Sequence, residues 1–245
     1  MPDPVVSAPA VSVVVPVYNE EGAAAPLARE IAAAFEGLDY EVIFVDDASR
    51  DGTVSSLLEA AADLPRLRVL RHGKNAGQSR AVRTGVMAAR APIIVTLDGD
   101  GQNDPADAPR LAQHLMAGPA TLGLVGGRRA KRQDSAAKRI ASRFGNGVRK
   151  QLLHDHADDT GCGLKAFRRD VFLRLPYFDH IHRYLPALVL REGFETAFED
   201  VGHRARTTGA SKYNNLGRAW VSVSDLCGVI WLRSRSRSPG SITEG

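Results

Sequence analysis

Asp98 and Asp100 belong to an Asp-Gly-Asp-Gly-Gln segment that follows directly on an apolar run at residues 93–97. The run predicts a buried strand, so the two carboxylates stand at a strand end, with a glycine between them that permits a tight turn. Carboxylates at this spacing can hold a hard divalent cation against a diphosphate. An isolated Asp-x-Asp is more often an ordinary acidic turn, so the other strand ends decide the interpretation.

The first predicted strand, at residues 11–17, also ends in residues suited to a nucleotide. Pro16 shapes the exit of the strand, Tyr18 can stack on a base, and Glu20 can accept a hydrogen bond from a ribose hydroxyl. Asn19 is interpreted as the cap of a following helix. Alone, this segment is a weak signal.

A second predicted strand, at residues 42–45, runs into Asp46-Asp47. Asp47 is a candidate ligand for the nucleoside. Asp51 lies in the turn that follows, where Ser, Asp and Gly are needed to form a helix cap in any case, so its role is interpreted as structural.

Strand and helix signals alternate along the first half of the chain. Short apolar strands, each followed by a helical pattern, are predicted at residues 11–17, 42–45, 67–70 and 93–97, with one more strand at 123–128. Strands buried on both faces and separated by amphipathic helices predict an α/β fold, a Rossmann-like, mostly parallel sheet flanked by helices. Such sheets bind ligands at the carboxyl ends of their strands, where the polar residues lie.

Taken together, four segments resemble the ordered donor-site motifs of family 2 glycosyltransferases with the GT-A fold: residues 15–21, 45–53, 75–81 and 98–102. Two later segments, 159–165 and 203–213, resemble the branch of dolichol-phosphate mannose synthases and bacterial polyprenyl-phosphate glycosyltransferases. The resemblance covers residues 10–231. The chain departs from the pattern at Ala48, where glycine is common, and it lacks the paired C-terminal transmembrane helices of many bacterial members.

The resemblance implies a role for each matching residue. The nucleotide-sugar donor, linked to UDP or GDP, is expected at Pro16, Tyr18, Glu20, Val45, Asp47, Asp98, Gly99, Arg206 and Lys212. The cofactor, Mg²⁺ or Mn²⁺, is expected at Asp98, Asp100 and Gln102. The residues expected to take part in catalysis are Asp100, Arg206, Lys212 and Asp159. A departing nucleoside diphosphate gains negative charge, so a divalent cation and fixed cations would stabilise it.

The acceptor is expected at a basic helix. If residues 135–153 form a helix, Arg139, Arg143 and Lys150 share one face, separate from an apolar face. With Arg128 upstream, this face suits a lipid phosphate or anionic head groups. A solvated basic face is the alternative, and the resemblance favours the lipid phosphate.

The C-terminal segment predicts an amphipathic helix with one apolar face. Its members are Leu216, Trp220, Val223, Cys227, Ile230 and Trp231. Two tryptophans followed by Arg233, Arg235 and Arg237 favour a membrane interface, and docking on the protein core is the competing interpretation. Three arginines without interleaved aromatic residues are too few to indicate nucleic acid.

The resulting domain prediction has four parts. Residues 1–10 form a flexible lead-in, and residues 11–215 form the GT-A domain, with a nucleotide-sugar-binding half at 11–128 and an acceptor-facing half at 129–215. An amphipathic helix at 216–233 and a flexible tail at 234–245 follow.

The composition is that of an ordinary globular protein of 245 residues, 44% apolar and 24% charged, with a net charge of +4. The two cysteines lie far apart without metal-ligand spacing, which favours a reducing cytoplasm. The first residues resemble no signal peptide, and no apolar run reaches the ~20 residues that span a bilayer. The expected location is cytoplasmic, at the periphery of the cytoplasmic face of the membrane.

These observations predict an inverting transfer from a nucleotide sugar to a polyprenyl phosphate. A phosphate oxygen is already anionic and requires little help from a base. If the acceptor were a hydroxyl of a lipid or glycan, Asp158 or Asp159 would be the candidate base. A non-catalytic nucleotide-sugar-binding protein is less well supported, because Asp98 and Asp100 are intact. An NAD-binding oxidoreductase is disfavoured because no G-x-G-x-x-G follows the first strand.

Overall fold

The protein is described by a computed structural model that covers residues 8–129, 149, 151–205 and 215–236. Its strands are β1 (Val11–Val17), β2 (Tyr40–Asp46), β3 (Leu67–Arg71), β4 (Ile93–Thr96), β5 (Leu122–Arg129), β6 (Lys165–Arg168) and β7 (Glu195–Val201). Its helices are α1 (Glu21–Ala34), α2 (Thr53–Asp63), α3 (Gln78–Ala88), α4 (Ala108–Ala117), α6 (Arg169–Arg174), α7 (Leu185–Arg191) and α8 (Asn215–Ser234), with short 3-10 turns η1 (Pro105–Asp107) and η2 (Ile181–Arg183).

All of these strands belong to one sheet with the order β3-β2-β1-β4-β6-β5-β7. Strand β1 is parallel to both β2 and β4, and β2 is parallel to β3. Strand β6 runs antiparallel between β4 and β5, and β7 is again parallel to β5. The predicted α/β fold with a mostly parallel sheet is therefore confirmed. The chain winds outward from β1 to β3 and then returns to β4 on the other side of β1, which creates the switch point where such sheets bind ligands.

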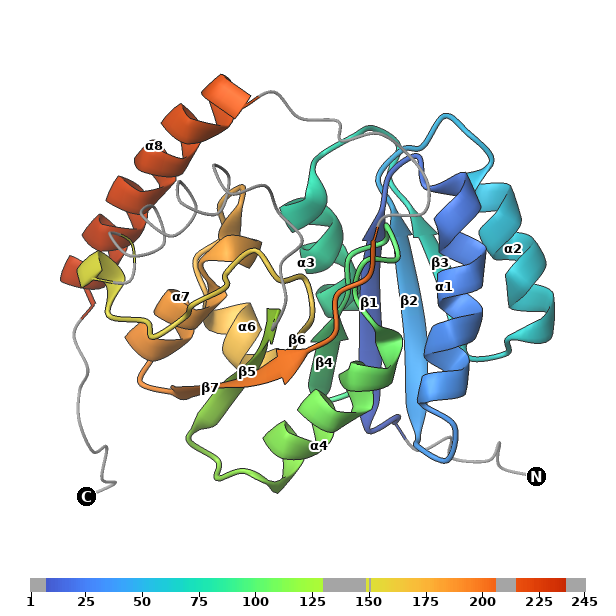
Figure 1. Cartoon of the computed structure of the whole chain (residues 1–245), viewed down its shortest axis with the longest axis horizontal. Helices are drawn as coiled ribbons and strands as arrows, with labels where there is room; N and C mark the ends of the chain where they lie inside the picture. The colour runs from blue at the N-terminus through green and yellow to red at the C-terminus, as the bar shows by residue number, and fades with distance from the viewer. Residues whose placement is uncertain (1–7, 130–148, 150, 206–214, 237–245) are drawn as a thin grey trace, which may run out of the picture.

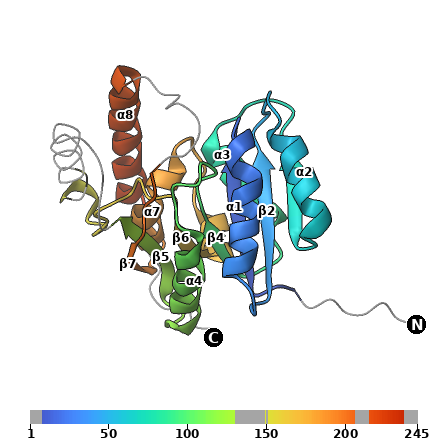
Figure 2. The same ribbon diagram turned by 45° about the vertical axis from the view of Figure 1, so that its right-hand side comes forward.

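Helices cover both faces of the sheet (Figure 1 and Figure 2). Helices α1, α2 and α4 share a core with one set of strand side chains, including Val13 and Phe44. Helices α3, α6 and α7 share a second core with the opposite set, including Val14 and Ile43. All seven residues of β1 are buried, which explains why its sequence is a continuous β-branched run rather than an alternating one.

The predicted capping role of Asn19 is wrong. The N-cap of α1 is Glu20, whose side chain makes no capping hydrogen bond. Asn19 instead adopts a left-handed backbone (φ 51°), and its Oδ1 accepts a hydrogen bond of 2.8 Å from the backbone N–H of Arg50. The asparagine therefore ties the end of β1 to the turn after β2.

Helix α8 confirms the predicted C-terminal helix. Val223 is 56% exposed and Trp231 is 57% exposed, so the predicted apolar face points outward where the structure describes its side chains. The helix docks through a different set, in which Leu226 and Leu232 lie against the second core and Val229 is buried within it. No helix in the described residues is long and apolar enough to cross a membrane.

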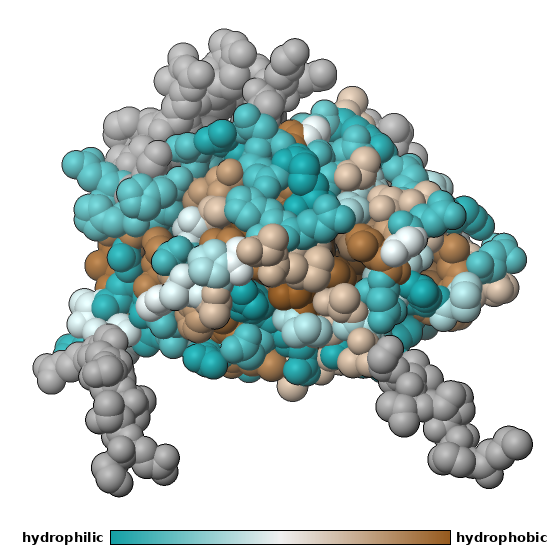
Figure 3. Space-filling model, turned by 90° about the horizontal axis from the view of Figure 1, so that it is seen from below, coloured by the Kyte–Doolittle hydropathy of each residue, from teal (hydrophilic) through white to brown (hydrophobic). Residues whose placement is uncertain are grey.

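On the side of the molecule seen from below, hydrophilic and hydrophobic residues intermingle over the surface (Figure 3). The predicted basic helix is described only at residues 149 and 151–153, so Arg139 and Arg143 lie outside the described residues.

Candidate active site

The Asp98–Gln102 segment forms a folded loop directly after β4. The backbone N–H of Asp98 donates to Asn103 Oδ1 (2.9 Å), and the N–H of Gln102 donates to Asp100 Oδ1 (3.1 Å). A Cβ at Gly99 would lie 2.6 Å from the carbonyl oxygen of Pro16. Glycine is therefore needed here because the loop packs against the end of β1, and this contact brings two predicted donor-site segments together.

Three neighbours surround the carboxylate of Asp98. Gln78 Nε2 donates a hydrogen bond of 2.8 Å to Asp98 Oδ1. Gly163 lies directly against the carboxylate, so that a Cβ at this position would overlap its carbon and both oxygens. The buried Lys165 acts on it electrostatically from β6. Asp98 is thus held in one orientation by residues from α3, β6 and the loop before β6.

The electrostatics of this loop suit a divalent cation. Burial and the negative charge of Asp100 raise the pKa of Asp98 above its ordinary value. A cation between the two carboxylates would relieve their repulsion. No group of three or more His, Cys, Asp or Glu side chains with metal-binding geometry occurs within the described residues. Mg²⁺ usually binds through one or two carboxylates together with substrate phosphates and water, so Asp98 and Asp100 suit an ion of this kind.

A small cavity adjoins Asp98 at the switch point between β1 and β4. It measures about 20 Å³ and is lined by Pro16, Gln78, Val82, Thr96, Leu97, Asp98, Gly163, Lys165, His182 and Leu185. Sequence reasoning assigned no role to Gln78, Lys165 or His182. The first two fall inside segments that carried the family resemblance, which is a usable signal, whereas nothing local marked His182.

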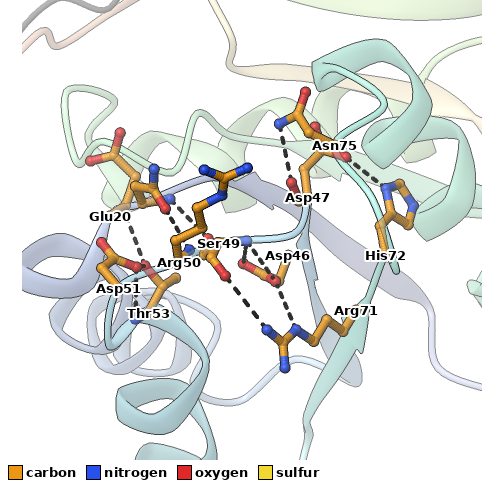
Figure 4. Close-up of polar contacts among 11 residues, drawn as sticks. Glu20, Asp46, Asp47, Ser49, Arg50, Asp51, Thr53, Arg71, His72 and Asn75 are labelled. Carbon is orange, nitrogen blue, oxygen red and sulfur yellow. Dashed lines mark hydrogen bonds and ion pairs between the residues drawn. The ribbon is translucent and has the colours of Figure 1, made fainter.

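Asp47, a predicted nucleoside contact, follows directly on β2 and is only 3% exposed. Its Oδ1 lies 2.7 Å from His72 Nδ1 (Figure 4). Oδ1 also accepts a hydrogen bond from the N–H of Ala76 (2.9 Å), and Oδ2 accepts one from the N–H of Gly77 (2.7 Å). The carboxylate therefore holds the loop that precedes α3. The side chain of Val45 is fully buried in the second core. It therefore packs beneath the end of β2 and does not face a ligand.

The turn after β2 is fixed by Asp51, as expected for a structural residue. Asp51 Oδ1 accepts hydrogen bonds from the N–H (3.1 Å) and the hydroxyl (2.5 Å) of Thr53. Thr53 Oγ1 accepts in turn from the N–H of Glu20 at 2.8 Å (Figure 4). These bonds place Glu20, a predicted donor contact, beside the end of β2.

Asp159 forms a close ion pair with Arg129 at the end of β5. Asp159 Oδ2 lies 2.6 Å from Nε and Oδ1 lies 2.7 Å from Nη2 of Arg129, and both side chains are largely buried. The neighbouring Asp158 lies 3.7 Å from Arg128, which also pairs with Asp200 at 2.7 Å. A carboxylate locked to a guanidinium is a poor proton acceptor, so this geometry favours a structural role for Asp159.

The predicted catalytic cations Arg206 and Lys212 lie outside the described residues. The segment that leads to them is described up to residue 205. The backbone of His203 forms an isolated antiparallel β-bridge with that of Asn103. The N–H of Arg204 donates a hydrogen bond of 2.9 Å to the carbonyl oxygen of Gln102. The segment that carries Arg206 therefore starts beside the Asp98–Gln102 loop.

The site and fold agree with sequence comparisons. The sequence model described as "Glycosyl transferase family 2" matches residues 12–175. The chain belongs to glycosyltransferase family 2.

Two curated relatives are the most informative. The undecaprenyl-phosphate 4-deoxy-4-formamido-L-arabinose transferase of Aeromonas hydrophila is 36% identical over 206 residues, which is 83% of this chain and 62% of that protein. The dodecaprenyl-phosphate galacturonate synthase of Rhizobium johnstonii is 32% identical over 234 residues, 94% of this chain and 69% of that protein. The chain thus spans about two thirds of the length of these relatives.

Solved structures confirm the GT-A fold. The glucosyl-3-phosphoglycerate synthase of Mycobacterium tuberculosis, crystallised with Mn²⁺, UDP and glucosyl-3-phosphoglycerate, superimposes with a TM-score of 0.70 at 20% identity, covering 95% of this chain and 82% of that one. Another structure of the same enzyme holds Mg²⁺ and UDP, with a TM-score of 0.69 at 18% identity and the same coverage. This structural neighbour has thus been crystallised with a divalent cation and a nucleoside diphosphate.

Proposed function

We propose that this chain transfers a sugar from a nucleotide sugar to a polyprenyl phosphate with inversion at the anomeric carbon. A phosphate oxygen of the lipid attacks the anomeric carbon, the bond to the diphosphate breaks, and a polyprenyl phosphosugar and a nucleoside diphosphate leave. The printed names of the curated relatives support a polyprenyl-phosphate acceptor. The observation that carries the choice of acceptor is the Arg129–Asp159 ion pair, because it occupies one of the two candidate bases that a hydroxyl acceptor would need; the other, Asp158, lies 3.7 Å from Arg128.

The donor is proposed to lie across the carboxyl ends of β1, β2 and β4. Asp98, Asp100 and Gln102 would hold Mg²⁺ or Mn²⁺, which supplies positive charge to the departing diphosphate. The nucleoside, uridine or guanosine, would lie near Pro16, Tyr18, Glu20 and Asp47. Arg206 and Lys212 are proposed to contact the diphosphate from the segment that follows Arg204, and Arg128, Arg139 and Arg143 to bind the lipid phosphate.

The outer face of α8 is proposed to contact the cytoplasmic face of a membrane. Val223, Ile230 and Trp231 are exposed on this helix, and Leu152 nearby in the acceptor half is 49% exposed. Indole and aliphatic side chains on one face of a docked helix, followed by Arg233 and further arginines, suit an interface with anionic lipid. This position would bring the acceptor to the enzyme.

Replacing Trp231 by glutamate is expected to weaken binding of the full chain to anionic lipid vesicles by about tenfold or more, because a large apolar contact is lost and a like charge is added. Vesicle sedimentation with phosphatidylglycerol measures it. Leu58→Glu on α2 is the matched control, since Leu58 is equally exposed (58%) but lies on another helix. Equal binding by the Trp231 variant and wild type would rule out this membrane face.

The Asp159→Asn variant distinguishes transfer to a phosphate acceptor from transfer to a hydroxyl acceptor. Loss of a buried ion-pair partner is expected to destabilise the fold by about 3–5 kcal/mol, and the folded fraction should keep appreciable activity. Charge reversal at Arg139 or Arg143 should instead weaken use of the acceptor strongly and spare slow hydrolysis of the donor.

The assay compares undecaprenyl phosphate with undecaprenol in detergent, for wild type and these three variants, below the melting temperature of each. Transfer to the alcohol alone, with the asparagine variant nearly inactive although folded, would contradict the proposal and make Asp159 or Asp158 the leading base candidate.

A further inference from the structure

The cavity beside Asp98 contains polar groups that the proposed roles of the donor-site motifs do not use. It lies between the end of β4, the first turn of α3 and the η2 turn, so it adjoins the carboxylate that would hold the metal. Gln78, Lys165 and His182 bring polar groups into its lining, while Val82 and Leu185 close it with apolar surface. About 20 Å³ is room for one water-sized group, such as a single substituent of a larger ligand.

His182 is held firmly in this lining. Its Nδ1 lies 2.7 Å from the hydroxyl of Ser79 on α3. Tyr177 fixes the preceding loop to the same helix through two cation–π contacts. The guanidinium carbon of Arg80 lies 3.9 Å from the centroid of the Tyr177 ring, and that of Arg83 lies 5.1 Å from it. These contacts come from one face of α3, so His182 has little freedom to reorient.

The surroundings of His182 favour its neutral imidazole. Burial, followed by the positive charge of Lys165, holds the pKa of His182 well below its ordinary value. Because Nδ1 is engaged by Ser79, Nε2 is the nitrogen left for another partner, and no other described residue hydrogen-bonds to it. When the Ser79 hydroxyl donates to Nδ1, Nε2 carries the proton and is a hydrogen-bond donor.

Gln78 supplies the complementary group. Its Nε2 donates to Asp98 Oδ1, which leaves Oε1 as an acceptor without a partner in the described part of the chain. Because both residues line the cavity, a donor at His182 and an acceptor at Gln78 are available to a group bound there. A hydroxyl group both donates and accepts, and it has the size of a water molecule.

We propose that His182, oriented by Ser79, and Gln78 bind one hydroxyl of the transferred sugar and so determine which sugar is accepted. This inference rests on the proposed function, because the hydroxyl belongs to the sugar of the donor. The location follows from the site itself, since the sugar is attached to the diphosphate that Asp98 and Asp100 would hold through the metal. A site built to hydrogen-bond a hydroxyl discriminates against analogues that lack it, because its buried polar groups would be left unpaired.

The test is calorimetric binding of the full chain, with Mn²⁺, to UDP, GDP and a panel of UDP- and GDP-linked hexoses with their monodeoxy analogues. His182→Ala is expected to weaken binding of the preferred nucleotide sugar by about tenfold relative to the free nucleotide, whose affinity should stay within about twofold of wild type. His182→Gln should recover part of the loss, because an amide can also donate. His114→Ala is the matched control on α4, where His114 pairs with Glu199 away from the cavity.

The monodeoxy analogues make the result specific. One monodeoxy analogue should bind to wild type and to the His182→Ala variant with equal affinity, because that analogue already lacks the hydroxyl that His182 contacts. Equal weakening of nucleotide and nucleotide sugar, or no analogue with this behaviour, would overturn the inference while leaving the proposed function in place. Failure of wild type to bind any nucleotide would instead contradict the proposed function and the inference with it.

Discussion

Replacing Asp100 by asparagine is expected to lower kcat for sugar transfer by at least about 100-fold, because the variant loses a charged ligand for the cation that offsets charge on the departing diphosphate. Asp98 alone is a poor substitute, because its burial, which the variant retains, raises its pKa above the ordinary value. The partly exposed position of Asp100 predicts a small effect on folding, within about 1 kcal/mol. Initial rates with saturating donor and the melting temperature measure both quantities.

Asp63→Asn is the matched control, because Asp63 is an exposed aspartate at the end of α2, far from the loop in sequence. It should keep wild-type rates. Excess chelator should inactivate wild type, and added Mn²⁺ or Mg²⁺ should restore it. Full activity of the Asp100 variant, or of wild type in excess chelator, would remove the metal assignment.

Gly163→Ala is expected to weaken Mn²⁺ binding by about 10–100-fold and to lower transfer accordingly, although residue 163 has no side chain and no charge. A Cβ there would overlap the carboxylate of Asp98, whose Oδ1 accepts a hydrogen bond from Gln78. The carboxylate must then rotate away from its present orientation or the loop before β6 must shift. Overpacking of this kind costs about 1–3 kcal/mol.

Mn²⁺ affinity in the presence of UDP, measured by calorimetry, separates this effect from unfolding. Gly228→Ala is the control, since a Cβ at Gly228 in α8 would meet nothing within 4 Å. A Gly163 variant that binds Mn²⁺ and transfers sugar as wild type does would show that the orientation of Asp98 is unimportant.

The parts of the site that lie close together in sequence were predictable. Asp98, Asp100 and Gln102 fall in one short segment after a β-branched strand, so local pattern and strand-end geometry were sufficient to group them. The ion pair between Arg129 and Asp159 joins residues that are 30 positions apart, and the Ser79–His182 contact joins residues 103 apart. Without the fold, no rule of spacing links them.

Local rules also failed where a long-range contact competed. Asn19 has the residue type of a helix cap, yet its side chain accepts a hydrogen bond from the backbone N–H of Arg50. Its backbone is left-handed, and the N-cap position falls one residue later, at Glu20. In α8 the helical projection found a genuine apolar face, but Leu226 and Val229 provide a second one. The sequence could not show which of the two meets the core, because both are apolar.

The central claim is that the chain glycosylates a lipid phosphate, and product identification tests it most directly. Purified full-length chain, Mn²⁺, undecaprenyl phosphate in detergent and a panel of UDP- and GDP-linked sugars would be incubated, and the lipid products analysed by mass spectrometry. The account predicts an undecaprenyl phosphosugar whose sugar is attached through the phosphate, together with an equal amount of free nucleoside diphosphate. Glycosylation of undecaprenol but not of undecaprenyl phosphate, or release of nucleoside diphosphate without any glycolipid, would contradict it.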